Sequence, residues 1–186
     1  FHWYLNVFHG ASYFRRWHGE SDKSGTLWVH KSTHHFDLLN WHLDSDPVEV
    51  MAYGDLEHYG KKGPFMGKNC RNCEHTSKCQ FHWDITKSQR DMLMYVQNEK
   101  HDGYIRDNCL FRENIDIYDK MSAQIKYANG VIVNYSLTTY SPYEGWQIGF
   151  NGFKGRLDSW EDLPWRRDEV VNHAELHAKE MAQDGS

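Results

Sequence analysis

The sequence has no long hydrophobic run and no excess of positive charge. No stretch of about 18 consecutive apolar residues occurs, so we expect no membrane-spanning helix. Lys and Arg number 21 against 26 Asp and Glu, which gives a formal net charge of −5 over 186 residues. Broad binding to nucleic acid or to an anionic membrane needs a basic face. We therefore expect neither among the partners of this chain.

Two further features are missing at the start of the chain. It begins at Phe1 without Met, and the residues 1–10 lack the basic start and apolar block of a secretory signal. We interpret the chain as a piece of a larger protein. We expect its four cysteines to be free thiols, which favours a cytoplasmic location. Any export signal would lie upstream of Phe1.

Aromatic residues and histidines are abundant instead. The chain has 8 Trp, 11 Tyr, 9 Phe and 13 His. Aromatic planes with polar rims suit sugar rings and other flat polar ligands. The alternative is that a domain of this size uses bulky residues to fill its core.

Hydrophobic spacing predicts an α+β fold. Apolar residues at three- and four-residue spacings predict a helix from Ser32 or Thr33 that ends before Asp46-Pro47. The alternating run 48–54 predicts a strand, and Asn129-Gly130 between two further alternating runs predicts a hairpin over 122–137. Two more strands are expected at 146–150 and 155–160, with a turn at 151–152. Together these elements predict an open, mostly antiparallel sheet with helices on one face.

The same reading divides the chain into two parts. Residues 1–165 form one domain, which includes a cysteine-bearing insertion at 57–110. Residues 166–186 form a charged tail that is partly helical or disordered.

The four cysteines lie in the predicted insertion. Cys70, Cys73 and Cys79 have the spacing C-x2-C-x5-C, and Cys109 follows thirty residues later. Two thiolates three residues apart can chelate one ion from a tight turn, and tetrahedral zinc takes four such ligands. Three alternatives stay open: a structural zinc ion, an iron–sulfur cluster, or thiols and disulfides. His75 or His82 could also replace one cysteine as a ligand.

A second group of titratable residues is expected on the first helix. His30, His34 and Asp37 are spaced i, i+4 and i+7, which places them on one face of a continuous helix. An imidazole such as that of His34 can act as a general acid or base near neutral pH. The alternatives are a divalent metal site and an ordinary solvated helix face.

The segment from Gly25 to Trp41 resembles a motif of the glucose–fructose oxidoreductase, inositol dehydrogenase and rhizopine-catabolism family (Gfo/Idh/MocA). That motif has two glycines, an Asp, a small residue, a His, a second Asp and a Trp, which correspond here to Gly25, Thr26, His30, Ser32, His34, Asp37 and Trp41. The run 150–157 also resembles the family's "G-x-K-G-x-L" strand end. The resemblance covers about Phe1 to Trp160.

The resemblance implies a C-terminal domain like that of glyceraldehyde-phosphate dehydrogenase, in an NAD- or NADP-dependent oxidoreductase. Family members act mostly on sugars and cyclic polyols, bind the dinucleotide on an N-terminal Rossmann domain, and commonly form oligomers through the exposed sheet face. By the same resemblance, His34 is the catalytic acid/base, Asp37 orients it or contacts the substrate, and His30 takes the place of an acidic partner.

This sequence also departs from the family pattern. His30 replaces an aspartate, and the cysteine insertion is not a general family feature. No G-x-G-x-x-G turn opens a helix after a strand, so we expect this chain alone to bind no dinucleotide and to catalyse no reaction. Two alternatives remain: a domain of an NAD-dependent glycosidase of the same family, and a zinc-stabilised module that binds carbohydrate or protein without catalysis.

Overall fold

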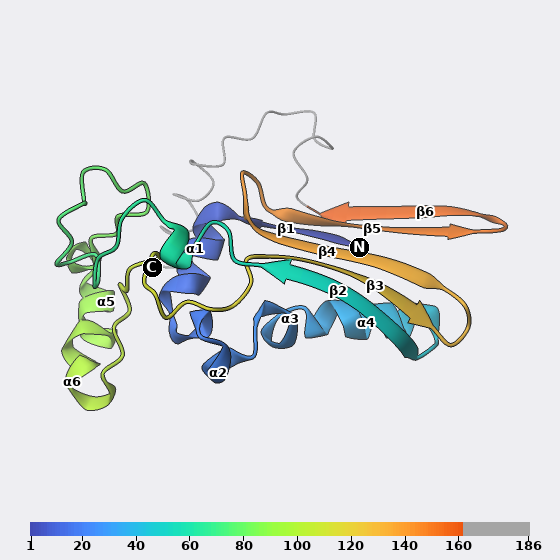
Figure 1. The fold of residues 1–186 in the computed structure, drawn as a ribbon, viewed down its shortest axis with the longest axis horizontal. Helices are drawn as coiled ribbons and strands as arrows, with labels where there is room; N and C mark the ends of the chain where they lie inside the picture. The colour runs from blue at the N-terminus through green and yellow to red at the C-terminus, as the bar shows by residue number, and fades with distance from the viewer. Residues whose placement is uncertain (162–186) are drawn as a thin grey trace.

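The computed structural model describes residues 1–161, and its centre is an open six-stranded sheet (Figure 1). The strand order is β2-β3-β4-β1-β5-β6. β1 is parallel to β4, and the other neighbouring pairs are antiparallel. The predicted open, mostly antiparallel sheet is therefore confirmed. In the described range, no helix has the length and apolar character needed to cross a bilayer.

The strands are short, and the helices are mostly one to three turns long. The strands are β1 His2–Asn6, β2 Pro47–Asp55, β3 Lys120–Tyr127, β4 Ile132–Ser141, β5 Gly145–Gly152 and β6 Gly155–Glu161. The helices are α1 Val7–Arg15, α2 Ser21–Ser24, α3 Leu27–His30, α4 Thr33–Leu43, α5 Gln89–Met94 and α6 Glu99–Asp102. Short 3-10 turns lie at Trp17–Gly19, Gly60–Lys62, Ile85–Lys87 and Val96–Asn98.

The hairpin of β3 and β4 forms as its sequence predicts. Every second residue of β3 is buried, as expected for a strand with one face on the core. Gly130 has a φ of 88°, a left-handed conformation that favours glycine, and its N–H donates to the Tyr127 carbonyl. The Asn-Gly pair thus fixes the register that brings the buried residues of both strands to the same face.

Helices α1, α3 and α4 lie on that buried face (Figure 1). Phe14 of α1, Leu27 of α3 and Leu39 of α4 are all at most 2% exposed and share one core with the inward residues of the sheet. The expected placement of helices on one face is confirmed, and it brings the histidine segment onto the outside of this helical layer.

The predicted insertion leaves the sheet after β2 and returns before β3. It consists of loops, 3-10 turns and the short helices α5 and α6, and Figure 1 shows these two helices beyond one end of the sheet. The expected tail at 166–186 and the last residues of the expected domain, 162–165, lie outside the described residues.

Two details differ from the sequence expectations. The turn between the last two strands lies at Phe153-Lys154 rather than at 151–152, because Gly152 still pairs with Gly155 in the ladder. The chain also starts with a central strand, β1, which no periodicity predicted; the Phe1 carbonyl accepts from Ser136 N, and His2 to Tyr4 pair with β4.

Candidate functional site

The segment that carries His30 and His34 is two helices rather than one. α3 ends at His30, and α4 begins at Thr33. Ser32, at the junction, is fully buried, and its hydroxyl accepts a hydrogen bond from Tyr135 instead of capping the helix. The expectation that His30 shares a continuous helix face with His34 and Asp37 is therefore wrong.

His34 and Asp37 lie together on the first turns of α4. They are three residues apart, which places them on the same side of the helix, and both are exposed. No hydrogen bond or ion pair joins the His34 ring to another residue in the range 1–161. The imidazole is thus open to a ligand rather than part of the core.

His35 is directed toward the core. Its Nδ1 lies 2.8 Å from the Tyr135 hydroxyl, and its ring stacks on Phe1. Because Tyr135 donates its proton to Ser32, the His35 nitrogen must supply the proton of the first bond. Burial lowers the pKa of His35 to about 4, with a smaller contribution from His34, so this ring is neutral at pH 7. It fixes α4 on the sheet and leaves His34 outside.

His30 belongs to a separate aromatic cluster with Tyr13, Trp17 and His18. Its Nδ1 lies 3.0 Å from the Tyr13 hydroxyl, and its ring stacks on His18 at 4.6 Å. His18 in turn stacks on Tyr13 at 4.9 Å. Sequence reasoning missed Tyr13 and His18, because α1 and the following turn carry no motif that pairs them with His30.

Both histidines of this cluster are neutral at pH 7. Burial lowers the pKa of His18 to about 4, with smaller contributions from the neighbouring His30 and Arg16. The pKa of His30 is also lowered, first by burial and then by Lys31 and Arg16. His30 therefore places a neutral hydrogen-bonding group where the family motif has a carboxylate.

The strand-to-helix junction at the start of the chain does not fit a dinucleotide. β1 passes directly into α1 at Asn6, without a glycine turn. The Asn6 side chain itself accepts from Phe8 N, so the donors at this helix start are partly satisfied from within the chain. The residues 1–161 thus offer no cradle for a pyrophosphate at this junction.

The cysteine insertion closes around a small cavity. Cys70, Cys73, Cys79 and Cys109 all line one space of about 20 Å³ together with His82, and none of the four is in a disulfide. His75 stacks on Phe65 at 4.6 Å. Burial raises the pKa of the Cys79 thiol. Within 1–161, no group of three or more His, Cys, Asp or Glu side chains is arranged to hold a metal ion as it stands.

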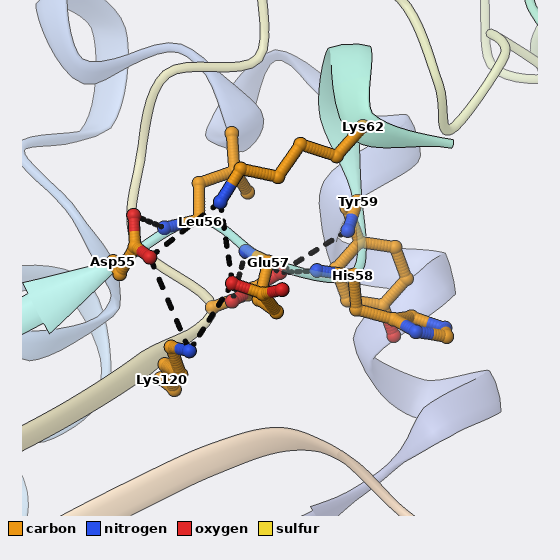
Figure 2. Close-up of polar contacts among 8 residues, drawn as sticks. Asp55, Leu56, Glu57, His58, Tyr59, Lys62 and Lys120 are labelled. Carbon is orange, nitrogen blue, oxygen red and sulfur yellow. Dashed lines mark hydrogen bonds and ion pairs between the residues drawn. The ribbon is translucent and has the colours of Figure 1, made fainter. Parts of the chain in front are cut away.

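A buried carboxylate fixes the start of the insertion. Asp119 is fully buried, and its oxygens accept from the backbone N–H groups of Glu57, His58 and Tyr59 at 2.6–3.1 Å. Figure 2 shows Asp55 and Glu57 beside it, paired with Lys62 and Lys120 at the surface. These exposed ion pairs are worth little, so the buried Asp119 carries the anchoring.

Tyr59 continues this anchor into the core. Its ring is fully buried and stacks on Phe14 of α1 at 4.4 Å, and its hydroxyl lies 2.8 Å from the Val7 carbonyl and 3.0 Å from the Thr139 carbonyl. The insertion is thereby joined to α1, the helix that also carries Tyr13 and Arg15.

Comparison with known proteins agrees with these features. The family model described as "Oxidoreductase family, C-terminal alpha/beta domain" (Gfo/Idh/MocA) matches residues 1–185. The chain is also 41% identical over 172 residues to the Bacillus subtilis (strain 168) protein named "Putative oxidoreductase YteT". That match covers 86% of this chain and 40% of the relative, so the chain spans about two fifths of the relative's length. Oxidoreductases of this family depend in general on NAD(P). The chain belongs to the Gfo/Idh/MocA oxidoreductase family and corresponds to its C-terminal α/β domain.

Proposed function

We propose that this chain is the substrate-binding and oligomerisation domain of an NAD(P)-dependent oxidoreductase acting on a sugar or a cyclic polyol. A Rossmann domain N-terminal to it would bind the dinucleotide, since the β1–α1 junction of this chain lacks the glycine turn that the cofactor needs. The observation that carries the proposal is the exposed His34 imidazole on α4, with Asp37 three residues further on, in a domain of this family.

His34 would act as the general base toward a substrate hydroxyl. Imidazole accepts and releases protons near neutral pH, and this ring is free to meet a ligand. Asp37, on the same side of α4, would orient the ring or hold a second hydroxyl. The dinucleotide, when bound, supplies the chemistry of hydride acceptance from the carbon that bears the hydroxyl.

His30 would bind the substrate as a neutral group. One ring nitrogen is engaged with Tyr13, which leaves the other to meet a hydroxyl. A neutral partner adds no negative charge beside the reacting oxygen. His34 would therefore carry the proton transfer without a neighbouring carboxylate at position 30.

The test uses the full-length protein and a panel of sugars and cyclic polyols with NAD⁺ and NADP⁺. We expect His34→Ala to lower kcat by about 10²–10⁴-fold, the usual contribution of a positioned acid/base, while NADH binding measured by fluorescence stays unchanged. His42→Ala is the matched control, since His42 is also exposed and lies in the last turn of the same helix.

Other outcomes separate the competing functions. Unchanged kcat in His34→Ala would remove this residue from the mechanism. A freed aglycone without net formation of reduced cofactor would identify an NAD-dependent glycosidase. Failure of the full-length protein to bind NADH at all would favour a non-catalytic module for carbohydrate or protein.

The open face of the sheet supports the oligomerisation role. Met51 and Tyr53 of β2 project from the same face as Gln124 and Ser122 of β3, with which they pair. Met51 is 56% and Tyr53 73% exposed, and Ile132 of β4 adds a third exposed apolar side chain at 66%. This mixture of aromatic, apolar and small polar side chains suits contact with a second copy of the domain.

A further inference from the structure

The two cysteine-bearing segments are held side by side by backbone hydrogen bonds. Asn69 and Asn108 form a β-bridge, Cys70 N donates to the Asp107 carbonyl at 2.8 Å, and Cys109 N donates to the Lys68 carbonyl at 3.2 Å. The distant Cys109 is thereby brought beside Cys70. From the sequence, the only reason to group Cys109 with Cys70, Cys73 and Cys79 was that it is the fourth cysteine.

Three of the four cysteine sulfurs accept a hydrogen bond from a backbone N–H group. His75 N donates to Cys73 Sγ and Phe111 N donates to Cys109 Sγ, both at 3.4 Å. In each case the donor lies two residues after the cysteine. Phe81 N makes the corresponding contact with Cys79. Donors directed at sulfur favour the thiolate over the thiol, and hydrogen bonds of this kind hold ligands around a metal.

A buried cation faces the same cavity. Arg15 of α1 is 5% exposed, and its guanidinium donates to Cys70 Sγ at 3.0 Å and to the carbonyls of Asn108 and Phe81. None of these partners is a carboxylate, and no ion pair of Arg15 with a carboxylate exists within the described part of the chain. Burying a charge costs free energy unless an opposite charge lies beside it. The buried Arg15 guanidinium is therefore stabilised if the neighbouring cysteines are thiolates.

We propose that Cys70, Cys73, Cys79 and Cys109 bind one Zn²⁺ ion as four thiolates. Binding releases four protons, and the zinc with its four thiolates carries a net charge of −2, which Arg15 faces. The sulfurs must draw in from their present positions to about 2.3 Å from the ion. His82, which also lines the cavity, is not needed as a ligand.

The small volume of the cavity favours a single ion over a cluster. Its volume is about 20 Å³, and a single water molecule needs about 10–15 Å³ on the same measure. One metal ion fits this space as the thiolates draw in, whereas a four-iron cluster with its inorganic sulfides would need the four cysteines to move apart. The ion would join residues 70–79 to the segment around Cys109, in an insertion whose regular structure is limited to short helices and 3-10 turns.

Metal analysis of the purified full-length protein tests the proposal. We expect one zinc per chain in the wild type, and replacement by Co²⁺ should give the intense visible absorption of a tetrahedral tetrathiolate. Cys73→Ser should lose the zinc and lower the Tm, and Ser77→Ala, an exposed change in the same loop, should keep both. If Cys73→Ser fails to fold, the cobalt spectrum of the wild type still decides the matter.

Four results would overturn the proposal. The first two are a wild type with no zinc and four titratable thiols, and a wild type with disulfides among these cysteines. The other two are a cobalt spectrum of octahedral type and the visible absorption of an iron–sulfur cluster in the purified protein. None of these measurements uses turnover or NADH binding, so the outcome is independent of the proposed oxidoreductase activity.

Discussion

The buried His18 and the half-buried His35 make the stability of the domain depend on pH. The pKa of each is lowered to about 4, chiefly by burial. An unfolded histidine takes up its proton near pH 6.5. Below about pH 6.5 the unfolded state therefore binds more protons than the folded state, and stability decreases as the pH falls toward 4.

Replacing His35 by Phe separates its share of this effect. At pH 7 we expect a loss of about 1 kcal/mol from the missing hydrogen bond to Tyr135. The fall in Tm between about pH 7 and about pH 4.5 should be smaller in His35→Phe than in the wild type, because one proton-linked group is gone. Thermal unfolding of the full-length protein across this range measures both.

The matched control for this change is His101→Phe, at an exposed position on α6. It should leave the pH dependence as it is in the wild type. If His35→Phe and the wild type have the same dependence of Tm on pH, the pKa of His35 is not lowered by folding.

At the scale of elements, the buried Asp119 joins the insertion to the sheet. Its carboxylate satisfies the N–H groups of Glu57, His58 and Tyr59, and its own backbone N–H and carbonyl pair with Asp55 and Thr139. Asp119→Ala should lower the free energy of unfolding by about 1–3 kcal/mol for each of the three side-chain-bonded N–H groups that is left buried without a new hydrogen-bond acceptor. Chemical denaturation of the full-length protein measures the loss.

Glu57→Gln provides the comparison, because the ion pairs of the Glu57 side chain within residues 1–161 are all exposed. It should change the free energy of unfolding by no more than about 0.5 kcal/mol. Equal effects of the two substitutions would mean that the surface pairs, and not the buried carboxylate, hold the insertion.

The elements that the sequence predicts well are those with a strict local pattern. β2, β3 and β4 alternate or pair across an Asn-Gly turn, so short-range periodicity is enough. β1 was missed because it is central and aromatic, and its partners, Ser136 and Leu137 among them, are more than 130 residues away. No local pattern encodes such a pairing.

The candidate site shows the same limit. Spacing alone put His30 and His34 on one helix, but burial of Ser32 under Tyr135 breaks the helix between them. Tyr135 lies about a hundred residues downstream, so the break depends on tertiary packing. The exposure of His34 and the clustering of His30 with Tyr13 follow from that packing and could not be derived from spacing.

At the scale of the whole molecule, the open face of the sheet is large enough for a stable interface. Strands lie about 4.8 Å apart and rise about 3.3 Å per residue. Six strands of about eight residues thus present roughly 750 Å² in projection, close to the approximately 800 Å² that each partner contributes to a standard interface. A second copy of the domain would cover the exposed Met51 and Tyr53.

The proposed self-association can be tested by placing charge on this face. We expect the full-length wild type to sediment as a dimer or larger oligomer. In the double variant Met51→Glu with Tyr53→Glu, the Kd for self-association should rise by at least about tenfold, because two carboxylates would be buried without partners. Trp41→Glu is the control, since Trp41 is 75% exposed and belongs to α4, a helix that lies on the opposite side of the sheet (Figure 1). A monomeric wild type, or equal dissociation in both variants, would place the interface elsewhere or exclude it.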